Sequence, residues 1–212
     1  FSSGGLMVCL VINGEELPHG GELAERLREA GVSSVSYSVN TERTNVIMGT
    51  RIVNLYGPGY ITDTIGDIEY RISPLSFYQV NPVQTEILYG KALEYAGLTG
   101  KETVVDAYCG TGTIGMIASD KAGKVIGVEL NADAVRDARN NAKANQIRNI
   151  QFYQNDAGKF LVEMAAQGAK VDVILMDPPR SGSTEEFMSS VVRIGPERIV
   201  YVSCNPETLV RD

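Results

Sequence analysis

From residue 73 onward, short apolar segments alternate regularly with longer segments of helical character. Segment 82–96, for example, begins with a proline and is followed by Gly97, as helices often are. Strands are predicted at Thr103–Ala107, Val125–Val128, Ile150–Tyr153, Val171–Met176 and Arg198–Val202, and further helices at Ile114–Lys121, Ala132–Ala144, Gly158–Gln167 and Thr184–Ile194. Repeated strand–helix–strand units build a parallel sheet with helices on both faces, and ligands bind at the edge where the strands end. This part of the chain is therefore predicted to be an α/β domain.

Residues 1–72 have a different texture, with Gly- and Asn-rich breaks such as Asn13-Gly14 between short runs. The apolar or alternating runs are Leu6–Ile12, Val32–Val39, Asn45–Met48 and Asp67–Ile72, and Glu22–Ala30 is a helix candidate that stops at Gly31. We predict a small α/β appendage over residues 1–72 and a separate domain over residues 73–212.

Composition excludes several classes of protein. The 212 residues include 19 Lys and Arg against 26 Asp and Glu, a net charge of −7 that argues mildly against binding nucleic acid by bulk charge. No apolar run is long enough to span a bilayer, so no membrane association is expected. Cys9, Cys109 and Cys204 lie far apart, which favours a reducing cytoplasm over a disulfide scaffold. One histidine, His19, and the lack of a CxxC pair predict no metal site.

The segment from Gly110 to Gly115 matches GxGxxG between a predicted strand and a predicted helix. Glu129 ends the next strand, 19 residues beyond Gly110, as in a dinucleotide site with an acid for a ribose hydroxyl. This pattern alone suggests a nicotinamide-dependent oxidoreductase. Asp106, four residues before Gly110, opposes that interpretation because a pyrophosphate needs a helix N-terminus without a nearby carboxylate. The acidic residues Asp106, Asp156 and Asp177 instead favour S-adenosylmethionine, because this ligand carries cationic groups.

Two later segments carry candidate chemistry. Asp177-Pro178-Pro179-Arg180 follows the fourth strand, where two prolines also suit a rigid turn. Cys204 lies past the end of the fifth strand, between Ser203 and Asn205, and a polar turn is where a reactive thiol is expected. Cys109 and Cys9 are instead expected to fill space, as most free cysteines do.

Together these segments resemble those of the RNA uracil-5-methyltransferase family, which makes 5-methyluridine in 23S ribosomal RNA or in the T-loop of transfer RNA. The matching segments are SFYQVN (Ser76–Asn81), DAYCGTGTIG (Asp106–Gly115), GVE (Gly127–Glu129), DPPRSG (Asp177–Gly182) and YVSCNPETLVRD (Tyr201–Asp212). The resemblance spans about residues 73–212 with the motifs in the family's order, and residues 1–72 look less specifically like its central domain.

The resemblance implies a Rossmann-like S-adenosylmethionine-dependent methyltransferase fold and methylation of uridine carbon 5 in RNA. It favours ribosomal RNA over transfer RNA as the substrate. Cys204 matches the nucleophile that adds to carbon 6 of uracil. The residues expected to line the S-adenosylmethionine pocket are Gln79, Tyr108, Gly110, Thr113, Glu129, Asp156 and Asp177.

Some features of the family have no counterpart among these residues. Its general base is a glutamate in a histidine–valine–glutamate motif well beyond SCNP, whereas the sequence ends at Asp212. Two further strands, the TRAM domain and the four-cysteine iron–sulfur cluster of some members also have no counterpart. The chain alone is therefore expected to bind cofactor with little turnover. We further expect either self-association through an unpaired strand edge or disorder in the SCNP loop.

Overall fold

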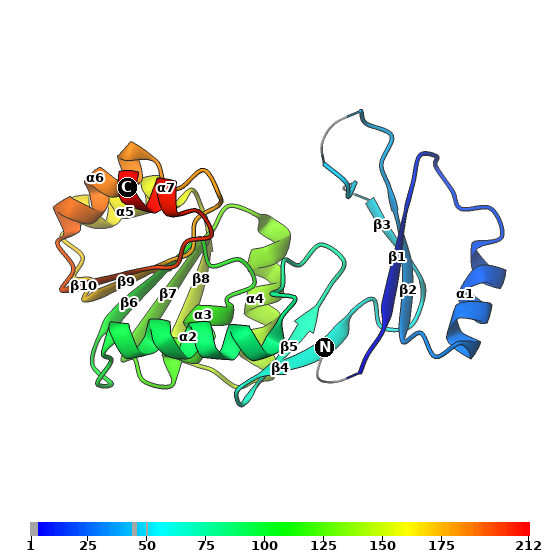
Figure 1. Ribbon diagram of the computed structural model, residues 1–212, viewed down its shortest axis with the longest axis horizontal. Coiled ribbons are helices and arrows are strands. Elements are labelled where there is room, and N and C mark those ends of the chain that lie inside the picture. The colour runs from blue at the N-terminus through cyan, green and yellow to red at the C-terminus, as the bar shows by residue number, and fades with distance from the viewer. Residues whose placement is uncertain (1–3, 44–45, 50) are drawn as a thin grey trace. The chain divides into compact units, whose positions relative to one another are not determined.

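The computed structural model describes residues 4–43, 46–49 and 51–212 and divides into two compact units (Figure 1). The smaller unit comprises Phe1–Thr64 and Glu69–Ser76, and the larger comprises Ile65–Ile68 and Phe77–Asp212. The sequence analysis places its domain boundary slightly earlier, between residues 72 and 73.

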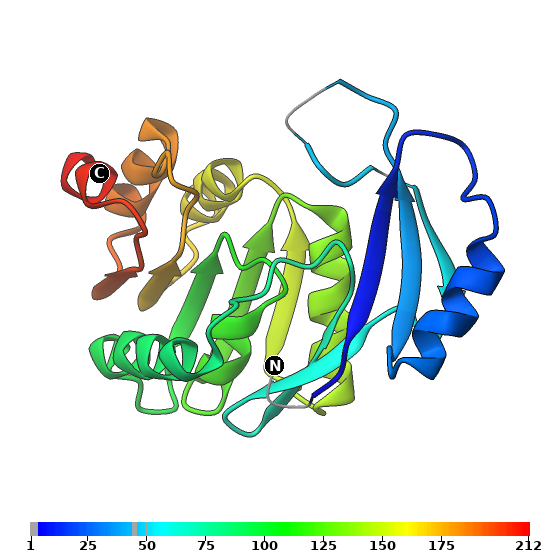
Figure 2. The ribbon, with the colours of Figure 1, turned by 45° about the vertical axis from the view of Figure 1, so that its right-hand side comes forward.

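The larger unit contains a five-stranded sheet in which every strand pair is parallel (Figures 1 and 2). The strands stand in the order β10-β9-β6-β7-β8. Their bounds are β6 Thr103–Ala107, β7 Lys124–Glu129, β8 Ile150–Gln154, β9 Val173–Met176 and β10 Arg198–Tyr201. From β6 the chain adds β7 and β8 on one side and then returns to add β9 and β10 on the other. The reversal leaves a switch point between β6 and β9, where α/β sheets bind ligands.

Helices cover both faces of this sheet. Contacts to the sheet come from α2 Pro82–Ala96, α3 Thr113–Ser119 and α4 Ala132–Ala144, and from α5 Ala157–Ala166, which also packs against α6 Glu185–Ile194. Val104 and Val105 are both fully buried, because successive strand residues point to opposite faces and both faces are covered. Val105 joins the apolar core that contains Leu161 of α5 and Phe187 of α6.

Local capping explains where the helices begin and end. Asn81 accepts a hydrogen bond from the Gln84 N–H at the start of α2, and Gly97 ends that helix in the left-handed conformation. Asn131 caps α4 in the same way. The capping residues are visible in the sequence, and the predicted bounds of α2 and α4 are confirmed. The predicted bounds of strand β6 are confirmed as well.

The smaller unit contains the sheet β1-β2-β3, with β1 Met7–Ile12 parallel to β2 Ser34–Val39 and β3 Arg51–Tyr56 antiparallel to β2. Helix α1, Gly20–Glu29, connects β1 to β2, and Ala24, Val32 and Val35 form a small core. Strands β4 Ile61–Ile65 and β5 Ile68–Ile72 pair as a separate two-stranded sheet.

The sequence analysis differs from the structure in several places. Of the run Asn45–Met48, Asn45 lies outside the described residues and residues 46–48 form no strand. Strands β3 and β4 were not anticipated. Strand β3 is partly exposed, and β4 (ITDTI) has polar residues at three of its five positions, including the buried Asp63. Helix α7, Pro206–Arg211, was missed because its six residues include no buried side chain and therefore no apolar face.

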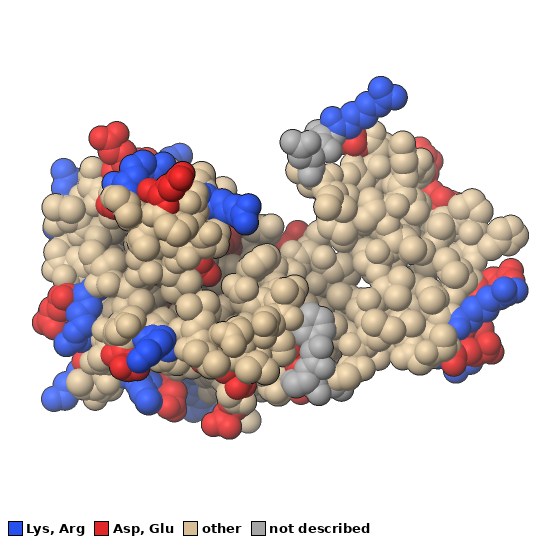
Figure 3. All heavy atoms as spheres, in the orientation of Figure 1, with Lys and Arg blue, Asp and Glu red and all other residues tan. Residues whose placement is uncertain are grey.

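Surface charge is mixed over the visible face of the larger unit, where acidic and basic side chains are interspersed (Figure 3). No helix in the described part of the chain combines the length and apolarity needed to cross a membrane.

Gly112 offers a test of how tightly the first loop packs on the sheet. It has a φ of +79°, and a Cβ there would lie 2.6 Å from the Phe152 ring. Gly112→Ala should therefore lose about 1–2 kcal/mol of unfolding free energy to left-handed strain and about 1–3 kcal/mol more to overpacking. Gly168→Ala is the matched control in urea unfolding, because Gly168 has a φ of +64° with open space around it. Equal losses in the two variants would contradict the packing.

Candidate active site at the carboxyl ends of the strands

The loop after β6 adopts a strained backbone. Tyr108 has a φ of +61°, and Gly110 and Gly112 are also left-handed. A non-glycine residue in this region is uncommon and marks a conformation that the surroundings enforce. The Gly112 N–H donates to the Cys109 carbonyl oxygen at 2.7 Å, which closes the loop just before α3 begins.

Asp106 lies beneath this loop, near the end of β6. Its Oδ2 accepts a hydrogen bond from the Gly115 N–H of α3 at 2.8 Å, and the residue is 1% exposed. Burial raises the pKa of Asp106 to about 7, and the nearby Asp177 and Glu129 carboxylates contribute to the increase. The sequence analysis expected this carboxylate to suit a cationic ligand. In the structure it is turned instead to the backbone of α3, so it shapes the loop.

Glu129, the last residue of β7, connects two loops. Its Oε2 accepts from the Gly110 N–H at 3.1 Å, and its Oε1 accepts from the Asn131 N–H at 2.8 Å. Each carboxylate oxygen has a further lone pair, so Glu129 can also accept hydrogen bonds from a bound diol. A Cβ at Gly110 would meet no atom within 4 Å, so the loop is open there, next to the carboxylate.

Asp177 follows β9 on the other side of the switch point. It is half-buried, and burial raises its pKa to about 6. The register pairs Ala107 of β6 with Met176 of β9, so the chain leaves both strands at the same level. Glu129 and Asp177 therefore place two carboxylates near the end of β6, above the buried Asp106, and this arrangement favours a ligand with positive charge.

Two further predicted residues, Gln79 and Thr113, meet at a tyrosine that the sequence analysis did not select. The Tyr89 hydroxyl lies 3.2 Å from Thr113 Oγ1, and Gln79 is among the groups that influence the pKa of Tyr89. Tyr89 belongs to α2, and its pKa is raised by burial and by the nearby Asp177 and Asp106. Nothing in the local sequence distinguishes it from other aromatic residues on the buried face of a helix.

Asp156, predicted to line the cofactor pocket, has a structural role in the fold. Its Oδ1 accepts from the Lys159 N–H at 3.0 Å and so caps α5. Burial raises the pKa of Tyr108, and the negative charge of Asp156 contributes to the increase.

Cys204 lies in the turn between β10 and α7, and it is the exposed cysteine of the three. Ser203 Oγ accepts from the Asn205 N–H at 3.1 Å and donates to the Asn205 carbonyl oxygen at 2.9 Å, which fixes the residues on either side. Asn205 also caps α7 and donates from Nδ2 to the Arg180 carbonyl oxygen at 3.4 Å. The thiol is therefore held beside the loop that begins at Asp177.

Asp212 also connects the segment after β10 to the loop after β9 through hydrogen bonds. Its Oδ2 accepts from the Tyr201 hydroxyl at 2.8 Å and from the Ser183 N–H at 2.7 Å, and Arg211 Nη2 donates to the Ser181 carbonyl oxygen at 2.9 Å. Gly182 has a φ of +78°, a conformation that favours glycine, and a Cβ there would displace the ends of the Arg211 and Asp212 side chains. The sequence analysis found no signal for this contact, because it joins residues about 30 positions apart.

Cys109 differs from Cys204 in both access and ionisation. It is buried, and burial together with Asp106 and Glu129 raises the pKa of its thiol well above the ordinary value. The thiolate is the nucleophilic form of cysteine, so Cys109 is poorly suited to attack a substrate. Among the described residues, no group of three or more His, Cys, Asp or Glu side chains is placed to hold a metal ion.

Comparisons with known proteins agree with this geometry. A family model described as a methyltransferase domain matches residues 98–210, and the chain belongs to this family. Its doubly wound sheet has the S-adenosylmethionine-dependent methyltransferase fold, and S-adenosylmethionine is its cofactor. The family assignment leaves the nicotinamide interpretation of the glycine loop without support.

Two curated relatives are named uncharacterized RNA methyltransferases. One, from Caldanaerobacter subterraneus subsp. tengcongensis, is 49% identical over all of this chain and 47% of its own length. The other, from Halalkalibacterium halodurans, is 50% identical over all of this chain and 46% of its own length. The chain thus spans about half the length of these relatives.

A solved structure is also similar. The Pyrococcus abyssi tRNA (uracil-54, C5)-methyltransferase, crystallised with S-adenosyl-L-homocysteine, is 29% identical with a TM-score of 0.78. The match covers 97% of this chain and 48% of that protein.

The raised pKa of Asp106 predicts how stability depends on pH. Because the folded-state pKa is about 7 against an ordinary 3.8, the native state binds more protons than the unfolded state between pH 4 and 7. The Asp106 contribution to stability is therefore lost as pH rises through this window. Relative to wild type, Asp106→Asn should gain stability on the order of a few kcal/mol from pH 4 to pH 8. Urea unfolding measures this gain.

Glu102 provides a control of opposite sign. Hydrogen bonds from Thr99 lower its pKa to about 2, so its contribution to stability appears as pH rises above that value. Glu102→Gln should thus lose stability relative to wild type between pH 2 and 5. If the free energies of unfolding of Asp106→Asn and wild type changed in parallel with pH, the raised pKa of Asp106 would be contradicted.

Proposed function

We propose that this domain methylates carbon 5 of a uridine in RNA, with Cys204 as the nucleophile. The observation that carries the proposal is the exposed thiol, held in a turn that is hydrogen-bonded to the Asp177–Arg180 loop at the carboxyl end of the sheet. The names of the relatives support an RNA substrate, and the 29% identical structure supports uracil carbon 5.

The residues around the glycine loop fit S-adenosylmethionine. Glu129 offers carboxylate oxygens to the ribose hydroxyls, beside the open surface of Gly110. Gln79, Tyr108, Thr113, Asp156 and Asp177 complete the proposed pocket. When bound, the cofactor supplies an electrophilic methyl group.

The chemistry of uracil explains the need for Cys204. Carbon 5 is a poor nucleophile, but a thiolate that forms a bond to carbon 6 moves the electron pair of the 5,6 double bond toward carbon 5 and the neighbouring carbonyl. Carbon 5 can then accept a methyl group. Loss of its proton to a base restores the double bond and expels the thiolate.

The substrate must present an unstacked uracil to the thiol. Carbon 6 is shielded in a stacked helix, so the enzyme must act on a flipped or single-stranded uridine. The sequence analysis favours ribosomal RNA, whereas the structurally similar Pyrococcus abyssi protein is named for transfer RNA. We retain uridine in RNA as the proposed substrate and include both RNAs in the test.

Two measurements separate cofactor binding from catalysis. In calorimetry with S-adenosylhomocysteine, Glu129→Ala should lose about 1–3 kcal/mol of binding free energy, while Cys204→Ala should bind as wild type does. In the protein at its full natural length, Cys204→Ala should abolish methylation of uridine in ribosomal or transfer RNA, as read by mass spectrometry. Cys109→Ala is the matched control and should keep most of the activity.

Each result would count against a distinct part of the proposal. Wild-type cofactor affinity in Glu129→Ala would contradict the pocket. Full methylation by Cys204→Ala would contradict the nucleophile, and the absence of 5-methyluridine from both RNAs with the wild-type protein would contradict the function.

A further inference from the structure

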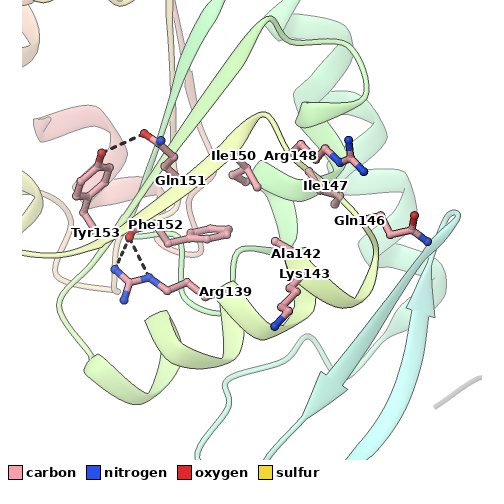
Figure 4. A pocket seen from close by; sticks show the side chains of 10 residues that line it. All are labelled: Arg139, Ala142, Lys143, Gln146, Ile147, Arg148, Ile150, Gln151, Phe152 and Tyr153. Atoms are coloured by element: carbon pink, nitrogen blue, oxygen red, sulfur yellow. Dashed lines mark hydrogen bonds between the residues drawn. The ribbon is translucent and has the colours of Figure 1, made fainter.

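A groove lies in the larger unit, between helix α4 and the edge strand β8 (Figure 4). Its cavity has a volume of about 610 Å³. The residues that line it are Arg139, Ala142, Lys143, Gln146, Ile147, Arg148, Ile150, Gln151, Phe152 and Tyr153. We call this surface the β8–α4 groove.

All charged side chains that line the groove are basic. Arg139, Lys143 and Arg148 face it with no carboxylate among the lining residues, in a chain whose net charge is −7. Within the described part of the chain, none of the three has an ion-pair partner. Arg148 also borders a second pocket lined by Asp67 and Asp120, but it pairs with neither of them. The positive charge of the groove is therefore not neutralised by ion pairs among the described residues and suits an anionic ligand.

The carboxylates of α4 are used elsewhere. Asp133 and Asp137 both pair with Arg136, which does not line the groove. Lys143 and Arg148 are exposed, so their charges are available to solvent or to a ligand.

The groove also presents donors and an aromatic face in fixed positions. Arg139 donates from Nε and Nη2 to the Phe152 carbonyl oxygen at 3.2 and 2.6 Å, which holds the guanidinium against β8 and leaves its other donors free. Tyr153 is 40% exposed, and its ring centroid lies 5.1 Å from that of Phe160. In Figure 4, Tyr153 and Arg148 stand toward opposite ends of the groove, with Arg139 and Lys143 between them.

We propose that the β8–α4 groove binds the phosphodiester backbone of the RNA substrate, away from the uridine that is methylated. Basic side chains bind phosphates without regard to sequence, and an exposed tyrosine can stack on an unpaired base. The inference rests on the proposed function for its RNA substrate.

The position of the groove separates it from the chemistry. Cys204 follows β10 at one edge of the sheet and the groove borders β8 at the other, four strand spacings or about 19 Å away. The groove therefore contributes to RNA affinity and leaves the chemical step unchanged.

The double variant Lys143→Gln/Arg148→Gln tests the proposal in the protein at its full natural length, with Arg139 kept because it hydrogen-bonds to the backbone. The matched control is Arg136→Gln/Lys91→Gln, which removes the same charge from exposed, ion-paired sites outside the groove. RNA affinity is measured by fluorescence anisotropy over a range of salt concentrations, and methylation is measured in parallel.

The groove variant should bind RNA roughly tenfold more weakly than the control near 0.1 M salt, and its slope of log Kd against log salt should fall by about one to two. KM for RNA should rise, with kcat and cofactor affinity unchanged. Arg148→Gln alone should show an intermediate effect.

Equal RNA affinity and equal salt slope in the two double variants would overturn RNA binding by the β8–α4 groove. Methylation by the wild type in the same experiment would show that the proposed function stands. A wild-type protein that binds RNA through the groove without methylating uridine would overturn the function and keep the binding surface. A wild-type protein that binds no RNA would overturn both.

Discussion

The hydrogen bond from the Gly115 N–H to Asp106 is the interaction on which the rest of the site depends. It ties the end of the central strand to the first turn of α3, and a side chain at Gly115 would collide with the same carboxylate oxygen. With α3 fixed, the loop between Ala107 and Thr113 must turn within a few residues, which accounts for its left-handed backbone. Burying a carboxyl is costly, and its raised pKa records that cost.

Two neighbouring contacts extend this arrangement across the sheet. Glu129 binds backbone N–H groups of the loops after β6 and β7, so the two loops are positioned together. Asp212 and Arg211 likewise join α7 to the segment after β9. The side chains that would bind cofactor and uracil therefore rest on hydrogen-bonded loops above a rigid parallel sheet, as precise positioning requires.

The sequence predicted the part of the fold that local signals determine. Helices α2 and α4 have clear caps, and β6 contains the buried apolar pair Val104 and Val105, one on each covered face of the sheet. Strand β3 was missed because it is half-exposed in a mixed sheet, and α7 was missed because it buries nothing. Local patterns cannot show such elements, which depend on contacts distant in the sequence.

In the candidate site, too, local signals were predicted from the sequence and contacts between distant residues were not. The glycine loop, Glu129 and Cys204 were selected from spacing and from their place after strands. Tyr89 was missed because its contact with Thr113 spans 24 positions, and the inward turn of Asp106 follows from packing against α3. The exposure of Cys204 and the burial of Cys109 now separate the two cysteines on physical grounds.

A covalent trap tests the central claim most directly. RNA that carries 5-fluorouridine at the target position, given with S-adenosylmethionine to the protein at its full natural length, should form a stable adduct, because fluorine cannot leave carbon 5 as a proton does. The account predicts a protein–RNA adduct that maps by peptide mass to Cys204, disappears in Cys204→Ala and persists in Cys109→Ala. An adduct that maps to Cys109, or one that persists in Cys204→Ala, would contradict it.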